Sequence, residues 1–123
     1  MRLITLVFII GVSFVPALFA DGIIAVLKDQ NTVYRSDAQT GAFKGSIQVN
    51  KAGSLGCDGQ TIAVLQKGGF INRYSADSGN FLGQIQVGPN ASNLQVASGV
   101  IVVTTGNSIT RYNARTGAFL GTN

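Results

Sequence analysis

Short apolar segments recur along the chain, and each is followed by residues suited to a tight turn. Three segments are continuously apolar, which predicts strands buried on both faces: 24–27, 62–65 and 100–103. Turn pairs rich in Gly and Asn, which tolerate the positive φ of hairpins, follow each segment: 30–31, 68–69 and 106–107. A second strand is therefore expected after each turn: 33–37, 71–75 and 109–113.

The residues after each second strand predict two more strands. In the segment 43–49, the residues Phe43, Gly45, Ile47 and Val49 alternate with polar residues and are expected to share one face. The segment 81–87 repeats this pattern, which is typical of an exposed outer strand. Short inner strands are expected over 55–57 and 94–96. Each unit therefore contains four antiparallel strands.

Residues of the same type recur every 38 positions without a gap. The step relates four sets of residues: Gly41, Gly79 and Gly117 in turns; Arg35, Arg73 and Arg111; Val26, Val64 and Val102; and Phe43, Phe81 and Phe119. A four-stranded unit of about 38 residues has the length of a propeller blade. The expected fold is all-β, with about three blades over 21–53, 54–91 and 92–123.

Two stretches of sequence carry a family resemblance. Residues 33–43 (VYRSDAQTGAF) and 109–121 (ITRYNARTGAFLG) resemble blades of secreted bacterial β-propellers, with NHL-like and quinoprotein-like repeats the most similar. The resemblance covers about residues 21–123. It implies a fold rather than one activity, because propellers serve as enzymes, receptors and scaffolds. Quinoprotein blades carry a Trp after the Thr-Gly turn, where this chain has Leu82 and Leu120, so no cofactor is expected.

The first 20 residues predict an export signal. Arg2 precedes an apolar stretch, Pro16 interrupts it, and cleavage is expected between Ala20 and Asp21. An uncleaved membrane anchor and a buried segment of the fold remain alternatives. The predicted location is secreted, periplasmic or cell-surface, with membrane contact only through an uncleaved signal.

The composition argues against catalysis by this chain alone. Its 123 residues include no His and no Glu, which excludes His-based acid–base catalysis and His-ligated metals. We therefore predict no enzyme activity and no metal site. The net charge of +4 comes from scattered side chains, so no nucleic-acid partner is expected. The single cysteine, Cys57, is expected to be buried, with an interchain disulfide or a free thiol as alternatives. Asn90 begins a glycosylation sequon.

The repeated arginines Arg35, Arg73 and Arg111 have two interpretations. They could form a cationic ring for a carboxylate, a sulfate or an acidic glycan. Alternatively, each could pack between blades, with its guanidinium bonded to backbone carbonyls or Asp. Their position, two residues after an apolar residue of the same strand, favours the second interpretation. Two further sets are interpreted as structural: the turn-setting residues Asp37, Ser75 and Asn113, and the aromatic residues Tyr34, Tyr74 and Tyr112.

The array is expected to be incomplete at both ends. Residues 17–20, equivalent to the inner strand of the second unit, lie in the predicted signal. The last copy stops at Asn123, which aligns with Ile47 and Ile85, so most of its outer strand is expected to be missing. Terminal blades without neighbours expose apolar faces, which predicts self-association into an oligomeric ring or a filament. The predicted function is a non-catalytic exported structural or binding module whose main partner is itself. The alternatives are a fragment or subunit of a larger propeller enzyme (lyase-like or lactonase-like) and a propeller that binds a glycan or another extracellular ligand.

Overall fold

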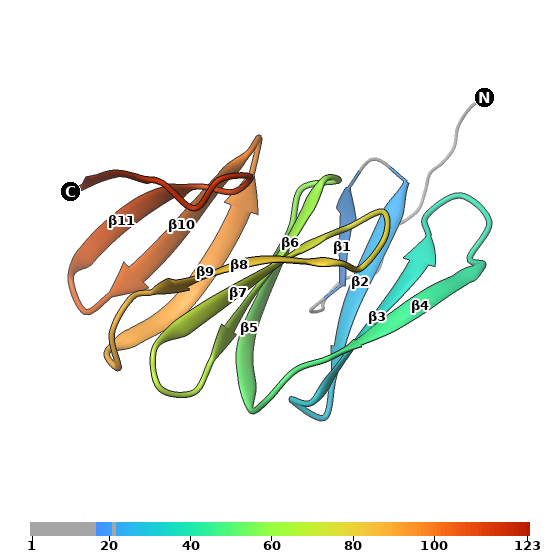
Figure 1. The fold of residues 1–123 in the computed structure, drawn as a ribbon, viewed down its shortest axis with the longest axis horizontal. Coiled ribbons are helices and arrows are strands. Elements are labelled where there is room, and N and C mark those ends of the chain that lie inside the picture. Colours follow the sequence, from blue (N-terminus) through green and yellow to red (C-terminus); the bar gives the residue numbers. More distant parts are fainter. Residues whose placement is uncertain (1–16, 21) are drawn as a thin grey trace.

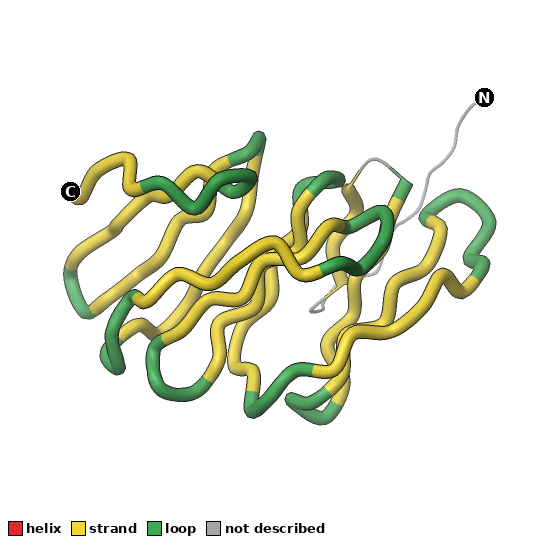
Figure 2. The backbone as a smooth tube through the Cα atoms, viewed as in Figure 1, coloured by secondary structure: helices red, strands yellow, loops and turns green. Residues whose placement is uncertain are grey.

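The computed structural model describes residues 17–20 and 22–123, which are strands joined by turns (Figures 1 and 2). These residues form three antiparallel four-stranded sheets that follow one another along the chain. The first blade contains β1 (Ala17–Ala20), β2 (Ile23–Lys28), β3 (Thr32–Asp37) and β4 (Phe43–Gln48). The second contains β5 (Ala52–Cys57), β6 (Thr61–Gln66), β7 (Phe70–Ser75) and β8 (Phe81–Gln86). The third contains β9 (Ala91–Ala97), β10 (Val100–Thr105), β11 (Ser108–Asn113) and β12 (Phe119–Thr122).

The prediction of three four-stranded blades is confirmed, and the structure corrects its detail at both ends. Ala17–Ala20 form β1, which pairs antiparallel with β2, so the first blade does have an inner strand. The last blade also has its outer strand, because β12 pairs with β11. Both end strands contain four residues, whereas the inner strands of the other blades contain six or seven. Within the described residues, each terminal blade therefore has all four of its strands.

The predicted cleavage site falls at the edge of the described residues. Residues 1–16 and Asp21 lie outside them, and Ala20 is the last residue of β1. Cleavage between Ala20 and Asp21 therefore stays a prediction. Within the described residues, the structure contains no helix that is both long and apolar enough to cross a membrane.

The third blade departs from the 38-residue step in its inner half. In the first two blades the hairpin joins Lys28 to Thr32 or Gln66 to Phe70, with three residues between. In the third blade only Gly106 and Asn107 separate the paired ends of β10 and β11. Because the loop is one residue shorter, Val102 pairs with Arg111 itself. In the first two blades, Val26 and Val64 pair instead with the residue that precedes the arginine. The structural equivalent of Val64 is consequently Val103, which is fully buried.

A β-bulge interrupts the alternation predicted for the outer strands. Arg35 pairs with Gly45, but Ser36 pairs with Phe43, so Lys44 is an extra residue on β4. An extra residue reverses the face on which the following side chains lie. Ile47 is buried whereas Phe43 is 65% exposed, so the expectation that they share a face is wrong. The same shift occurs in β8 and β12.

The core lies between the blades rather than within any one of them. Between the first and second blades, Val33 and Ile47 pack with Ile62 and Val64. Cys57 belongs to this first core, which confirms the predicted burial of its thiol. Desolvation raises the pKa of Cys57 above its ordinary value.

The second core repeats the arrangement of the first between the second and third blades. Ile71 and Ile85 of the second blade pack with Ile101 and Val103 of the third. Each buried aliphatic side chain contributes about 1.5–3 kcal/mol relative to exposure. One blade without a neighbour would lose this contribution, so the blades stabilise one another.

Candidate functional site

The turn after the third strand of each blade is set by one local side chain. Asp37 Oδ1 accepts hydrogen bonds from the backbone N–H groups of Gln39 and Thr40, at 2.8 and 3.0 Å. Asn113 makes the equivalent pair of bonds in the third blade, and Ser75 Oγ accepts one bond in the second. The predicted turn-setting role of these residues is confirmed. Because the side chains bind the turn's N–H groups, the turn's carbonyl oxygens remain available to other donors.

Arg35 uses those carbonyl oxygens to fasten the first blade to the second. Its Nη1 donates to the carbonyl oxygens of Ala76 and Asp77, at 3.1 and 2.9 Å. Its Nη2 donates to the carbonyl oxygens of Ser78 at 3.3 Å and of Lys44 at 3.1 Å. Lys44 is the extra residue of the bulge on the arginine's own blade. One guanidinium therefore joins β3, the bulge of β4 and the turn of the next blade.

Arg73 repeats this contact between the second and third blades. Its Nη1 donates to the carbonyl oxygens of Ala114 and Arg115, at 3.2 and 2.7 Å. Its Nη2 makes a longer bond, 3.4 Å, to the carbonyl oxygen of Leu82 in the bulge of β8. We call this arrangement, in which an arginine of one blade binds the turn of the next, the arginine–turn contact.

Both arginines of these contacts are deeply covered. Arg35 and Arg73 are each 5% exposed. Desolvation lowers the pKa of Arg73 below its ordinary value. The carbonyl dipoles compensate for part of the lost hydration of each guanidinium. The Nε atoms of both arginines have no hydrogen-bond partner among the residues described. This geometry agrees with the structural interpretation of Arg35 and Arg73. The guanidinium N–H groups that an anion would need already donate to carbonyl oxygens.

Arg111 keeps the pose of the other two arginines but is exposed. A Cβ atom added to Gly121 would meet Arg111 Nη2 at 2.8 Å, just as one added to Gly45 would meet Arg35 Nη2 at 2.7 Å. The guanidinium thus lies over the bulge glycine of its own blade. Within residues 17–20 and 22–123, Arg111 has no turn of another blade to bind.

The first blade carries the opposite half of the contact. Ala76 and Ala114, whose turns bind an arginine, are 0% and 1% exposed, whereas Ala38 is partly exposed. A Cβ atom added to Gly79 would meet Arg35 at 3.0 Å, but one added to Gly41 would meet nothing within 4 Å. The turn at 38–41 is therefore formed, and no other described residue covers it.

The outward faces of the two terminal blades are apolar around these groups. On β2, Ile24 and Val26 alternate with residues that pack against the second blade, so they lie on the opposite face. On β10, Val100 and Val102 likewise lie opposite the residues of the second core. Ile109 on β11 is 40% exposed.

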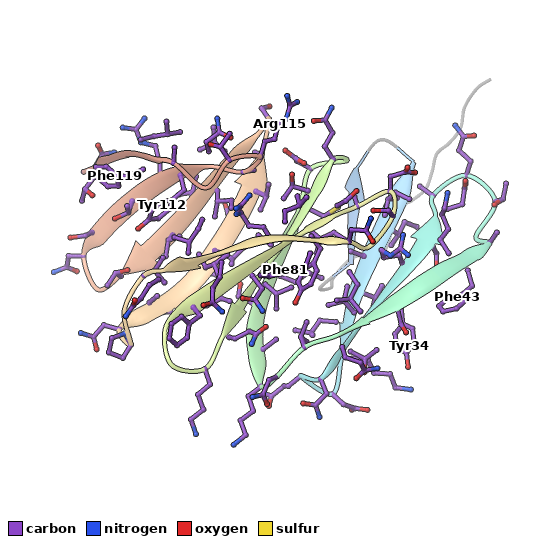
Figure 3. The ribbon with its side chains drawn as sticks, viewed as in Figure 1. Tyr34, Phe43, Phe81, Tyr112, Arg115 and Phe119 are labelled. Atoms are coloured by element: carbon purple, nitrogen blue, oxygen red, sulfur yellow. The ribbon has the colours of Figure 1, made fainter. Side chains whose placement is uncertain are left out.

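The predicted aromatic set is only partly equivalent in three dimensions. Tyr74 and Tyr112 lie at matching positions and pack edge-on against Phe81 and Phe119, with centroids 5.7 and 6.0 Å apart. Tyr34 lies two residues earlier in its strand and reaches Phe43 at 6.2 Å. Figure 3 shows the labelled members of these pairs, Tyr34, Phe43, Phe81, Tyr112 and Phe119, spread over all three blades. The exposed phenylalanines therefore form a row along the outer strands.

Sequence reasoning predicted backbone carbonyls as acceptors for the arginines but did not locate them in the turn of the next blade, because carbonyl oxygens leave no mark in residue types. The usable signal was the glycine two residues after each repeated phenylalanine, since its position gives the guanidinium room. Ser54 and Asn93 form another missed contact between blades, at 2.8 Å. In the described part of the chain, no three His, Cys, Asp or Glu side chains gather as a metal site.

Comparison with known proteins places the fold but no family. No family model and no curated protein matches the sequence. Among solved structures, BamB from Moraxella catarrhalis superposes with a TM-score of 0.66 at 18% sequence identity. The match covers 83% of this chain and 33% of the BamB chain. The WD40 repeats of RRP9 give 0.68 at 16% identity, over 83% and 35% of the two chains. Sqt1 from Saccharomyces cerevisiae gives 0.67 at 15% identity, over 82% and 31%. The fold is thus of the β-propeller type, and the chain spans about a third of the length of these three proteins.

Proposed function

We propose that the protein is a non-catalytic, exported module of the β-propeller type that assembles with copies of itself. The resemblance to secreted bacterial blades and the predicted signal support export. The absence of His and Glu from the sequence supports a role without catalysis. The observation that carries self-assembly is the pair of open terminal faces, each of which has a covered equivalent inside the chain.

The blade count supports a particular assembly. Propellers usually close with about four to eight blades, and two copies of a three-bladed chain supply six. A contact that uses different surfaces on each copy closes into a ring when the rotation fits, and otherwise grows into a filament. We therefore propose a closed dimer, with a filament as the alternative form of the same contact.

Light scattering and negative-stain microscopy of the full 123-residue chain test the proposal. The expected result is a discrete dimer with a ring-shaped outline, or a regular filament, at micromolar concentration. A folded chain that stays monomeric over the whole concentration range would contradict self-assembly.

Export has a consequence for the first blade that a second measurement addresses. Cleavage after Ala20 would remove β1 together with the signal and leave the inner edge of β2 without its ladder partner. N-terminal sequencing of the chain recovered from outside the cytoplasm identifies the first residue. Recovery of the chain only in the cytoplasm would contradict the proposed export.

A further inference from the structure

We infer that a second copy of this chain binds through the arginine–turn contact, with Arg111 of one copy on the turn at 38–41 of the other. The inference rests on the proposed self-assembly and specifies the surfaces that make it. It follows from a comparison of the two contacts inside the chain with the two halves left open at its ends.

The donor half is already in position. Arg35 and Arg73 lie over the bulge glycine of their own blade and extend to the next blade's turn. Arg111 lies over Gly121 in the same pose, on the face that a following blade would cover. A guanidinium held in this way loses little conformational entropy when it binds, since its pose is set before the partner arrives.

The acceptor half has the same local structure as the turns that are occupied. Gly41 has a φ of 77°, close to the 81° of Gly79 and the 82° of Gly117. Its closing bond, from Gly41 N–H to the carbonyl oxygen of Asp37, is 2.8 Å long, and the equivalent bonds of the other turns are 2.7 Å. In the part of the chain that the structure describes, no donor binds the carbonyl oxygens of Ala38 and Gln39.

The surrounding faces match in position but not fully in polarity. Ile24 and Val26 correspond to Ile62 and Val64, which fill the first internal core. On the third blade, however, Thr104 stands where the second blade has Leu65, because Thr104 pairs with Ile109 as Leu65 pairs with Ile71. The face of the third blade therefore carries a polar residue at a position that is apolar in the internal contact, and we expect the contact between copies to be reversible.

Two single substitutions remove one half of the contact each. Arg111→Met removes the guanidinium but keeps an unbranched apolar side chain. Gly41→Asn fills the space that a guanidinium occupies beside Gly79 and Gly117, and Asn tolerates the positive φ of this position. A Cβ atom at position 41 meets no described atom of the same chain within 4 Å. Lys67→Ala is the matched control, because it removes one exposed charge from the second blade.

Sedimentation equilibrium of the full chain gives the first readout. We expect Arg111→Met and Gly41→Asn each to raise the dissociation constant between copies at least about tenfold, since a charge-assisted bond is lost. Lys67→Ala should leave the constant unchanged. Circular dichroism and thermal unfolding should show that all variants keep the wild-type fold.

Mixing the two variants gives the second readout. The Gly41→Asn chain keeps an intact Arg111, and the Arg111→Met chain keeps an intact turn. An equimolar mixture should therefore form a 1:1 heterodimer with one contact, at concentrations where each variant alone is monomeric. In the heterodimer, the unused arginine position belongs to the Arg111→Met chain and the unused turn to the Gly41→Asn chain. Neither can make a further contact, so the heterodimer should not extend.

The outcomes separate this inference from the proposed function. If the wild type associates and both variants associate equally well, the arginine–turn contact does not join the copies, although self-assembly stands. If the variants are monomeric but their mixture forms no heterodimer, the head-to-tail pairing is wrong. If the wild type itself is monomeric throughout, self-assembly fails, and the inference fails with it.

Discussion

The internal arginine–turn contact should contribute measurably to stability, and replacing Arg73 with Met tests this. The substitution keeps most of the packed stem and removes the guanidinium. It leaves the carbonyl oxygens of Ala114 and Arg115 without their donor, after bonds of 3.2 and 2.7 Å. The third bond, to Leu82 at 3.4 Å, is too long to add much.

The magnitude follows from two opposing effects. Two hydrogen bonds from a charged donor contribute about 3–6 kcal/mol together. The substitution also ends the desolvation of a guanidinium that is 5% exposed, which returns part of that free energy. We expect a net loss of about 2–4 kcal/mol in the free energy of unfolding. For a domain of this size, that loss lowers the Tm by roughly 8–16 °C.

Urea unfolding at a concentration where the chain is monomeric is the assay, with Arg111→Met as the matched control. Because Arg111 is exposed and binds no neighbouring blade among the residues that the structure describes, its substitution should change stability by less than about 0.5 kcal/mol. An equally small effect for Arg73→Met would refute the reasoning. The buried guanidinium of Arg73 would then contribute no more to the free energy of unfolding than a surface side chain does.

Three further predictions concern other described residues. Gly56→Ala should destabilise the chain by about 1–3 kcal/mol in urea unfolding, because its Cβ would lie 2.6 Å from Val96 Cγ2, while Gly53→Ala, with open space around it, should be neutral. Hydrogen bonds from the N–H groups of Thr40 and Gln39 lower the pKa of Asp37. The ionised Asp37 carboxylate therefore stabilises the fold above the ordinary carboxyl pKa, and this stabilisation is lost as the pH falls through the lower pKa of the folded chain. If Asp37→Asn left the acid dependence of the Tm unchanged, the prediction would be contradicted. Cys57 should resist a thiol reagent such as DTNB until urea unfolds the chain, since burial both covers the thiol and raises its pKa; rapid labelling of the folded chain would show that the first core opens readily.

The sequence predicted the strands well because their signals are local. Apolar runs and turn residues each occupy a few adjacent positions, and the structure places strands where they predicted them. The faces of the outer strands were predicted wrongly because a bulge is defined by pairing with another strand. Nothing in the alternation around Lys44 indicates that this residue is skipped by the ladder.

The same limit applies to the candidate site. The sequence singled out Arg35, Arg73 and Arg111 correctly as a repeated set, but the set is not uniform in three dimensions. Two of its members are covered by a following blade and the third is not. This difference depends on position in the array, which a local sequence pattern shared by all three blades does not reveal. β1 was missed for a related reason, because the apolar character of 17–20 suits an export signal and an inner strand equally well.

Each sheet begins and ends within one continuous segment of chain, and this has a consequence for how such a protein can change over generations. Duplication or deletion of one unit breaks no ladder, because no strand is shared between sheets. The new neighbours also recreate the same junction, since every unit supplies an arginine on one side and a turn on the other. Copy number is therefore free to vary in single steps, and an inherited change of one unit would alter the circumference of an assembly without a new interface having to evolve.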